Sequence, residues 1–127
     1  MAVTHDPTLR NQIADFVLGT LNAGTADATG DLVFLDATEA AVATLNLSAT
    51  AFGAASAGTA TANAISDDTN AVGGTITHAA LRDRDNAAKI MCSVTANGGG
   101  GDIELSSVNI NAGDIIKMTA LTYTACP

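Results

Sequence analysis

VATLNLSATAFGAASAGTATANAIS, residues 42–66, is a stretch of 25 residues without one charged side chain. Its alanines alone would favour a helix, but threonine, serine and glycine are too frequent for one. Residues 43–48 alternate apolar and polar side chains, and residues 59–64 alternate a hydroxyl or amide with a methyl group. Because this period of two is that of a β-strand, and Gly53 and Gly58 lie between the two segments, the stretch predicts strand, bend and strand. Its one phenylalanine is expected to be the large core anchor.

Further strands are expected on both sides of this stretch, at residues 31–36, 75–81, 89–95, 102–105, 108–110 and 115–124. The last is the longest alternating segment. Arg82–Asn86 carries charges of alternating sign and is expected to be a solvated hairpin turn, with contact to a neighbouring molecule as the alternative. About eight short strands separated by regular turns predict a mainly β fold, an antiparallel β-sandwich or jelly-roll-like barrel.

A helix is predicted before the strands, over Pro7–Asn22. Asp6 can cap its start, Pro7 suits the first helical position, and Gly24 suits a left-handed end. The helix is expected to cover a sheet face, or alternatively to reach onto a partner, through side chains at helical spacing, namely Leu9, Ile13, Phe16, Val17 and Leu21. Residues 1–127 are expected to form a single domain, with an N-terminal arm and helix at 1–24 and the β-sandwich at 31–125.

The composition limits the kinds of partner. The 127 residues carry a net charge of −8 and only 3% are aromatic, so we expect a thin core that neighbouring subunits help to stabilise. No basic patch is present, which disfavours nucleic acid, and the acidic balance disfavours anionic membranes. The first residues do not resemble a signal peptide, and no apolar run is long enough for a membrane span.

No set of residues indicates catalysis or a cofactor, so we do not expect an enzyme. His5 and His78 are the candidate bases, and they are expected to be a terminal and a sheet-face histidine. Cys92 and Cys126 are expected to be free thiols, although a bridge stays possible if their strands pair. The carboxylates of residues 67–68 lack the rest of a calcium loop, and the glycines of residues 98–101 lack the lysine and helix of a phosphate loop.

Four segments of the chain do resemble a known family. They are LNLSATAFGAASAGTATANAI (45–65), ANAISDD (62–68), GGGGDIELS (98–106) and GDIIKMTALTYT (113–124). Together with the short N-terminal helix, their order is similar to that in small structural proteins of tailed-bacteriophage virions. The resemblance covers about residues 8–125.

This resemblance implies a capsid decoration, or cement, protein made in the host cytoplasm and mounted on the outer surface of the virion head. It implies a homotrimer that binds the major capsid protein, without a cofactor. The expected contacts are one sheet edge and the N-terminal residues Ala2, Val3, Thr4, His5 and Asp6. A tail, neck or fibre-associated subunit and a carbohydrate- or surface-binding β-sandwich are the alternatives.

Overall fold

The computed structural model describes residues 3–125. Within them lies one α-helix, α1 (Pro7–Gly19), which ends in a 3₁₀ turn, η1 (Thr20–Asn22). Nine short strands follow, and the expectation of a mainly β fold with an N-terminal helix is confirmed. The strands are β1 (Asp31–Leu35), β2 (Ala41–Asn46), β3 (Thr59–Thr61), β4 (Gly74–Thr75), β5 (His78–Arg82), β6 (Ala88–Ala96), β7 (Ile103–Leu105), β8 (Asn109–Ile110) and β9 (Thr122–Thr124).

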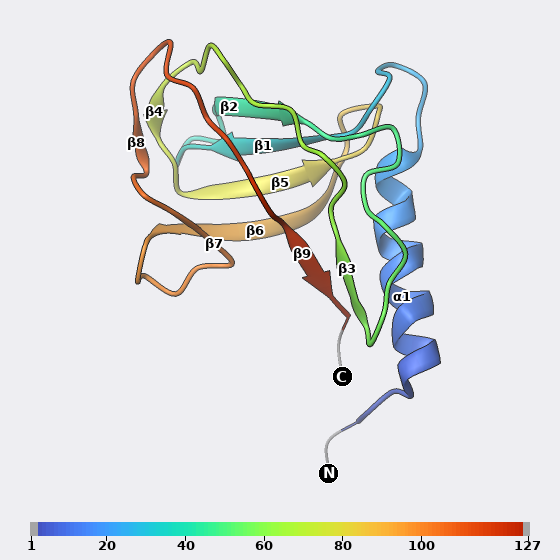
Figure 1. Ribbon diagram of the computed structural model, residues 1–127. Coiled ribbons are helices and arrows are strands. Elements are labelled where there is room, and N and C mark those ends of the chain that lie inside the picture. Colours follow the sequence, from blue (N-terminus) through green and yellow to red (C-terminus); the bar gives the residue numbers. More distant parts are fainter. Residues whose placement is uncertain (1–2, 126–127) are drawn as a thin grey trace.

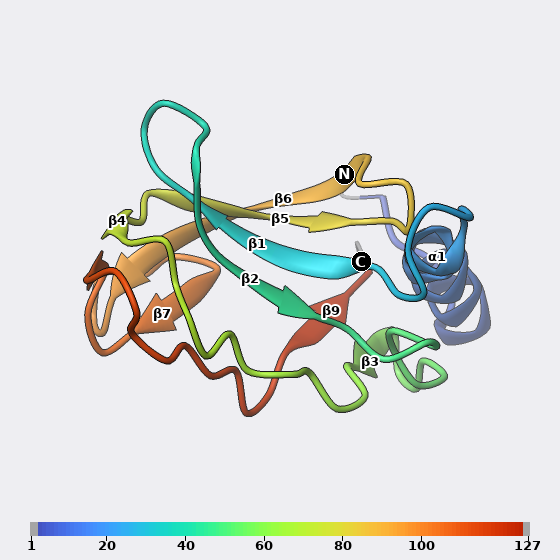
Figure 2. The same ribbon diagram turned by 90° about the horizontal axis from the view of Figure 1, so that it is seen from above.

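The main sheet has the strand order β2-β1-β5-β6-β7 and curls as it goes (Figures 1 and 2). Its pairs are antiparallel except β6–β7, which is parallel. Two small antiparallel pairs, β3–β9 and β4–β8, complete the strands. β9 and β3 lie beside one another next to α1, in front of the main sheet in the view of Figure 1. The fold is therefore one curled sheet closed over by a second layer of short strands and connections.

The core is built on the middle strand of the sheet, β1. Leu32 stands opposite Leu45 on one neighbour and Leu81 on the other, and all three side chains are buried. Phe34 instead stands between two alanines, Ala43 and Ala79. Because a large ring sits between two methyl groups, the layer stays filled although the chain has few large side chains.

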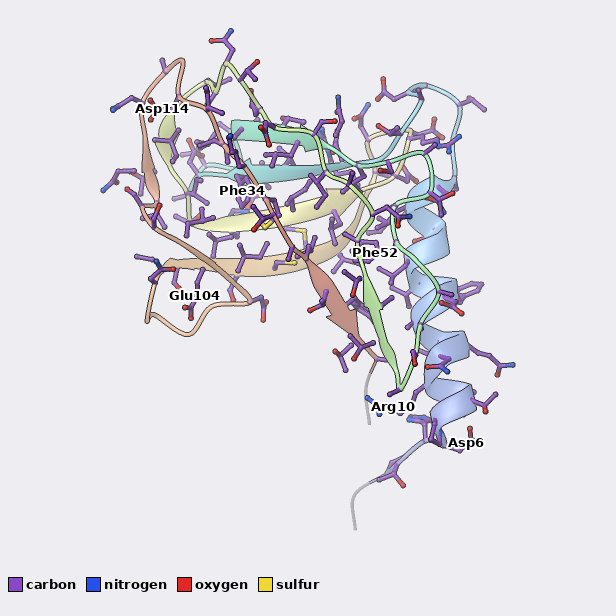
Figure 3. All side chains as sticks on the ribbon, in the orientation of Figure 1. Asp6, Arg10, Phe34, Phe52, Glu104 and Asp114 are labelled. Carbon is purple, nitrogen blue, oxygen red and sulfur yellow. The ribbon has the colours of Figure 1, made fainter. Side chains whose placement is uncertain are left out.

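The opening stretch folds nearly as predicted. Phe52 forms an isolated bridge with Ala62, and its side chain is only 6% exposed, between α1 and the sheet (Figure 3). The chain reverses at Gly58, whose φ of 78° suits glycine. Gly53 was expected beside the turn as well, but it lies in the ladder, where its N–H donates to the Thr61 carbonyl.

Two predicted strands are wrong in extent. The segment 75–81 divides into β4 and β5, because the Ile76 N–H donates to the Val108 carbonyl and not to a strand of the main sheet. The segment 115–124 pairs at Ile116, which bridges Asp68, and again from Leu121, whose carbonyl accepts the Ala62 N–H, through β9. Alternation predicts which side chains face inward, but it does not supply a neighbouring strand to bond with.

The predicted helix is correct in its bounds and its start. The Asp6 carboxylate accepts the Leu9 N–H at 2.8 Å, and Pro7 occupies the first helical position. The predicted buried face is wrong apart from Leu21. The residues that α1 and η1 bury are instead Ala14, Leu18 and Leu21.

The predicted hairpin turn between β5 and β6 is confirmed, and Asp85 and Asn86 at its tip are exposed, but the turn is also tied into the fold. The Arg82 guanidinium makes two hydrogen bonds to the Asp31 carboxylate, at 2.6 and 2.7 Å. These bonds hold the pKa of Arg82 above its ordinary value. The Asp85 carboxylate accepts the backbone N–H groups of Thr25 and Ala26. The turn therefore fastens the connection that leads from the helix to β1.

Candidate interaction surface

Beside the face that buries Ala14, Leu18 and Leu21, three polar side chains of α1 and η1 accept hydrogen bonds from a loop of the same chain. Asn11 Oδ1 accepts the Gly58 N–H and Asp15 Oδ1 accepts the Ala55 N–H, both at 2.8 Å. Farther along, Asn22 Oδ1 accepts a third loop N–H at 2.9 Å. The three residues share one helix face at spacings i, i+4 and i+11, and this spacing was the sequence signal that an apolar periodicity misses. They satisfy the backbone of a loop with few ladder bonds of its own.

The start of the helix holds the other end of the described chain. Arg10 Nη2 donates to the Ala125 carbonyl at 3.2 Å, and the guanidinium lies against Gly58. A Cβ at residue 58 would come within 2.6 Å of the guanidinium carbon. Both charged side chains of α1, Arg10 and Asp15, are therefore used within the molecule.

The apolar side chains of α1 that were predicted to be buried form an exposed band instead. We call this band the outer stripe, and it consists of Leu9, Ile13, Phe16 and Val17. Phe16 is 78% exposed and Leu9 is 40% exposed, while the other two are half-buried. The stripe contains no charged residue. A continuous apolar band on an otherwise well-tied helix is typical of a surface that contacts another molecule.

The N-terminal arm precedes this stripe. Val3 is 78% exposed and Thr4 is exposed, whereas His5 is half-buried. Asp6 is committed to the helix cap, and Ala2 lies outside the described residues. The predicted contact segment is thus available to a partner at Val3 and Thr4, directly before the first turn of the outer stripe. Its role in binding stays a prediction.

The half-buried ring of His78 lies between a hydroxyl and a carboxylate. Its Nδ1 is 2.7 Å from Thr77 Oγ1, and its Nε2 is 3.0 Å from Glu39 Oε1, at an angle that makes no hydrogen bond. Glu39 sits in the turn between β1 and β2 with a φ of 67°. A protonated ring would attract this carboxylate, so the contact ties that turn to β5, as expected of a sheet-face histidine.

Two other candidate sites are occupied by the fold itself. Asp68 was expected in a solvated turn, but its carboxylate accepts the Thr44 N–H and the Asn70 N–H, both at 2.9 Å. The Gly-rich loop donates two N–H groups, from Gly98 and Gly100, to the Glu104 carboxylate at 3.1 Å. This carboxylate occupies the position that an anion would need. Among residues 3–125, no three His, Cys, Asp or Glu side chains form a group that could hold a metal ion.

Cys92 is a half-buried thiol on β6. Burial raises the pKa of this thiol, and the nearby Asp102 carboxylate raises it further. Its thiolate form, which is the reactive one, is therefore scarce at neutral pH. Cys126, the other half of the possible bridge, lies outside the described residues.

Comparison of the chain with models of protein families, with curated protein sequences and with solved structures finds no match. None of the helices in residues 3–125 is long and apolar enough to cross a membrane. Of the large apolar side chains that are exposed in the described chain, Val3, Leu9 and Phe16 belong to the arm and the outer stripe.

Proposed function

We propose that this chain is a structural subunit of a tailed-bacteriophage head, a decoration protein that binds the major capsid protein on the outer surface of the virion. The observation that carries the proposal is the outer stripe, because α1 buries Ala14 and Leu18 against its own chain and leaves its largest apolar ring, Phe16, 78% exposed. The segments that resemble phage structural proteins support the same role. The subunit acts mechanically, as a bridge between neighbouring capsid proteins.

The binding strength follows from burial and from repetition. Covering a large side chain such as Phe16 contributes about 1.5–3 kcal/mol, and the other members of the stripe contribute less because they are already partly covered. One subunit alone binds weakly by this measure. A homotrimer that engages three sites together, as we propose, raises the overall affinity by orders of magnitude. Many such trimers on one head would then resist its expansion and rupture.

The test uses capsids of the phage that encodes the chain, prepared without this protein. Purified protein is added, the bound copies per capsid are counted by cryo-electron microscopy, and the temperature at which the capsids release DNA is measured. We expect hundreds of copies over the head and a higher release temperature. A handful of copies at one vertex, or full binding without a gain in heat resistance, would contradict the cement role.

Two variants connect this result to the stripe. Phe16→Asp places a charge at the centre of the stripe, and we expect it to abolish binding while the purified variant melts like the parent. Val72→Asp is the matched control, because Val72 is 70% exposed but lies in the connection between β3 and β4. We expect this control to bind as the parent does. Equal loss of binding in both variants would remove the stripe from the proposal.

A further inference from the structure

The structure contains a gap in its β-layer between two unpaired strand edges. One edge is β7, which ends the main sheet and pairs within residues 3–125 only with β6. The other edge is the segment 117–120. Its backbone N–H and C=O groups make no hydrogen bond to any other part of the described chain. This segment belongs to the longest alternating pattern of the sequence.

A groove runs along this gap. Its larger part has a volume of about 670 Å³ and is lined by β7, the adjoining residues up to β8, and residues 114–120; Figure 3 labels two of the lining residues, Glu104 and Asp114. A smaller part of about 190 Å³ continues between β7 and Met118–Thr122. Leu105, Met118 and Leu121 rest against the core but are only half-buried, so they leave apolar surface in the groove. The groove is therefore lined mainly by polar groups, with unpaired strand backbone on two walls and apolar surface from these three side chains.

These features define the ligand by its chemistry. A groove with an unpaired strand edge on each wall accepts an extended chain between the two edges by backbone pairing. Pockets for alternate side chains then give the specificity. A peptide of this kind would complete the ladder between β7 and the segment 117–120. It would also cover the half-exposed apolar surface with every second side chain. A small polar ligand would not pair with the backbone groups along the whole length of either wall.

We propose that this groove receives the N-terminal arm of a second copy of the chain, at residues 3–5. Val3 to His5 precede the helix cap, and their backbone can run beside residues 117–120 at about 3.3 Å per residue. Asp6 is already in an extended conformation, and Val3 and Thr4 are exposed. Val3 supplies the side chain for the apolar surface of the groove, and Thr4 then faces solvent.

Position favours a neighbour's arm over the chain's own. In the view of Figure 1 the arm lies at the lower right, before the start of α1, whereas β7 and β8 lie at the left of the molecule. Two carboxylates, on Glu104 and Asp114, and one ammonium, on Lys117, line the groove, so its net negative charge disfavours an acidic strand. The residues that enter, Val3 to His5, carry no acidic group. Each copy would give one arm and accept one, a head-to-tail arrangement that closes into a ring when the rotation allows it.

The test is backbone hydrogen exchange on the purified full chain, so it does not depend on the capsid proposal. Samples at two protein concentrations about a hundredfold apart are compared, because exchange of an arm between copies follows mass action. At the higher concentration we expect slower exchange at residues 117–120 and at residues 3–5, together with a larger mass by light scattering. Exchange at residues 117–120 that is equally fast at both concentrations would overturn the proposal.

Two variants of the arm separate strand pairing from other association. Thr4→Pro removes the N–H and bends the arm, so we expect the concentration-dependent protection of residues 117–120 to disappear. Thr4→Val keeps a β-branched side chain and is expected to retain that protection. An increase in mass that leaves residues 117–120 unprotected would mean that copies associate through the outer stripe instead, and it would also overturn the proposal.

Discussion

The charged turn at residues 82–87 and the outer stripe of α1 reverse the usual relation between polarity and position. The turn is the most highly charged part of the chain, yet Asp31 and Asp83 beside and within it are buried. The stripe is apolar, yet Phe16 is among its most exposed residues. Charge in this molecule is used to hold segments together, because the core has few large side chains for that purpose. The surface left for a partner is consequently apolar.

The largest expected effect is the difference in unfolding free energy between alanine variants of a buried and an exposed phenylalanine. Phe52→Ala should lower the free energy of unfolding by about 3–5 kcal/mol, because it removes a ring from the core. Phe16→Ala should change it by less than about 0.5 kcal/mol, because its ring touches little of its own chain. Urea denaturation of both variants measures the two values. A large loss in Phe16→Ala would show that the stripe supports the monomer, and the comparison would then fail.

The next effect concerns the charges of the turn. Arg82→Met leaves the Asp31 carboxylate buried without its partner and should cost about 3 kcal/mol, at the low end for such pairs because Arg82 is partly exposed. Lys89→Met is the matched control. The Lys89 ammonium lies 3.6 Å from the Asp83 carboxylate, and the lysine side chain is 40% exposed. The loss of unfolding free energy should therefore stay below about 1 kcal/mol. The same denaturation series applies, and equal losses would mean that the Arg82 pair is no more than a surface contact.

A smaller loss of stability is expected where the turn makes hydrogen bonds to the connection before β1. Asp85→Ala removes the acceptor for the N–H groups of Thr25 and Ala26, which water can then reach, so the loss should be about 1 kcal/mol. Hydrogen exchange should become faster at these two amides and stay unchanged in β6. Unchanged exchange at both amides would show that the connection is ordered by other contacts.

The smallest effect is a dependence on acid. The Ala87 N–H, followed by the Asp85 N–H, donates to the Asp83 carboxylate and lowers its pKa. In the unfolded chain this pKa returns to about 3.9. The carboxylate therefore stabilises the fold fully above about pH 4, and this contribution is lost as the pH falls through the lower pKa of the folded state. Thermal melts below pH 4 should fall less steeply in Asp83→Asn than in the parent; parallel curves would contradict the assignment.

The sequence allowed the helix, its cap and most strands to be predicted, because Asp6–Pro7 and the period-two segments are local signals. The predictions that were wrong depended on contacts between segments far apart in the chain. The inward face of α1 is chosen by Asn11 and Asp15, whose partners are backbone groups of a loop far along the chain, and no periodicity of apolar residues reports such bonds. The same cause hid the contacts of Asp68 and Asp85. The outer stripe was visible as an apolar face, but only the structure showed that it is left uncovered.

The strand order also sets a sequence of events in time. β1 lies between β2 and β5, so its first neighbour follows immediately along the chain, while the second is complete only once Arg82 has been made. β3 waits longer still, because its partner β9 ends at Thr124. During synthesis on a ribosome, the apolar middle strand therefore has one open edge for much of translation. Pairings between segments so far apart form slowly, and such chains depend on reaching full length before their edges meet another copy.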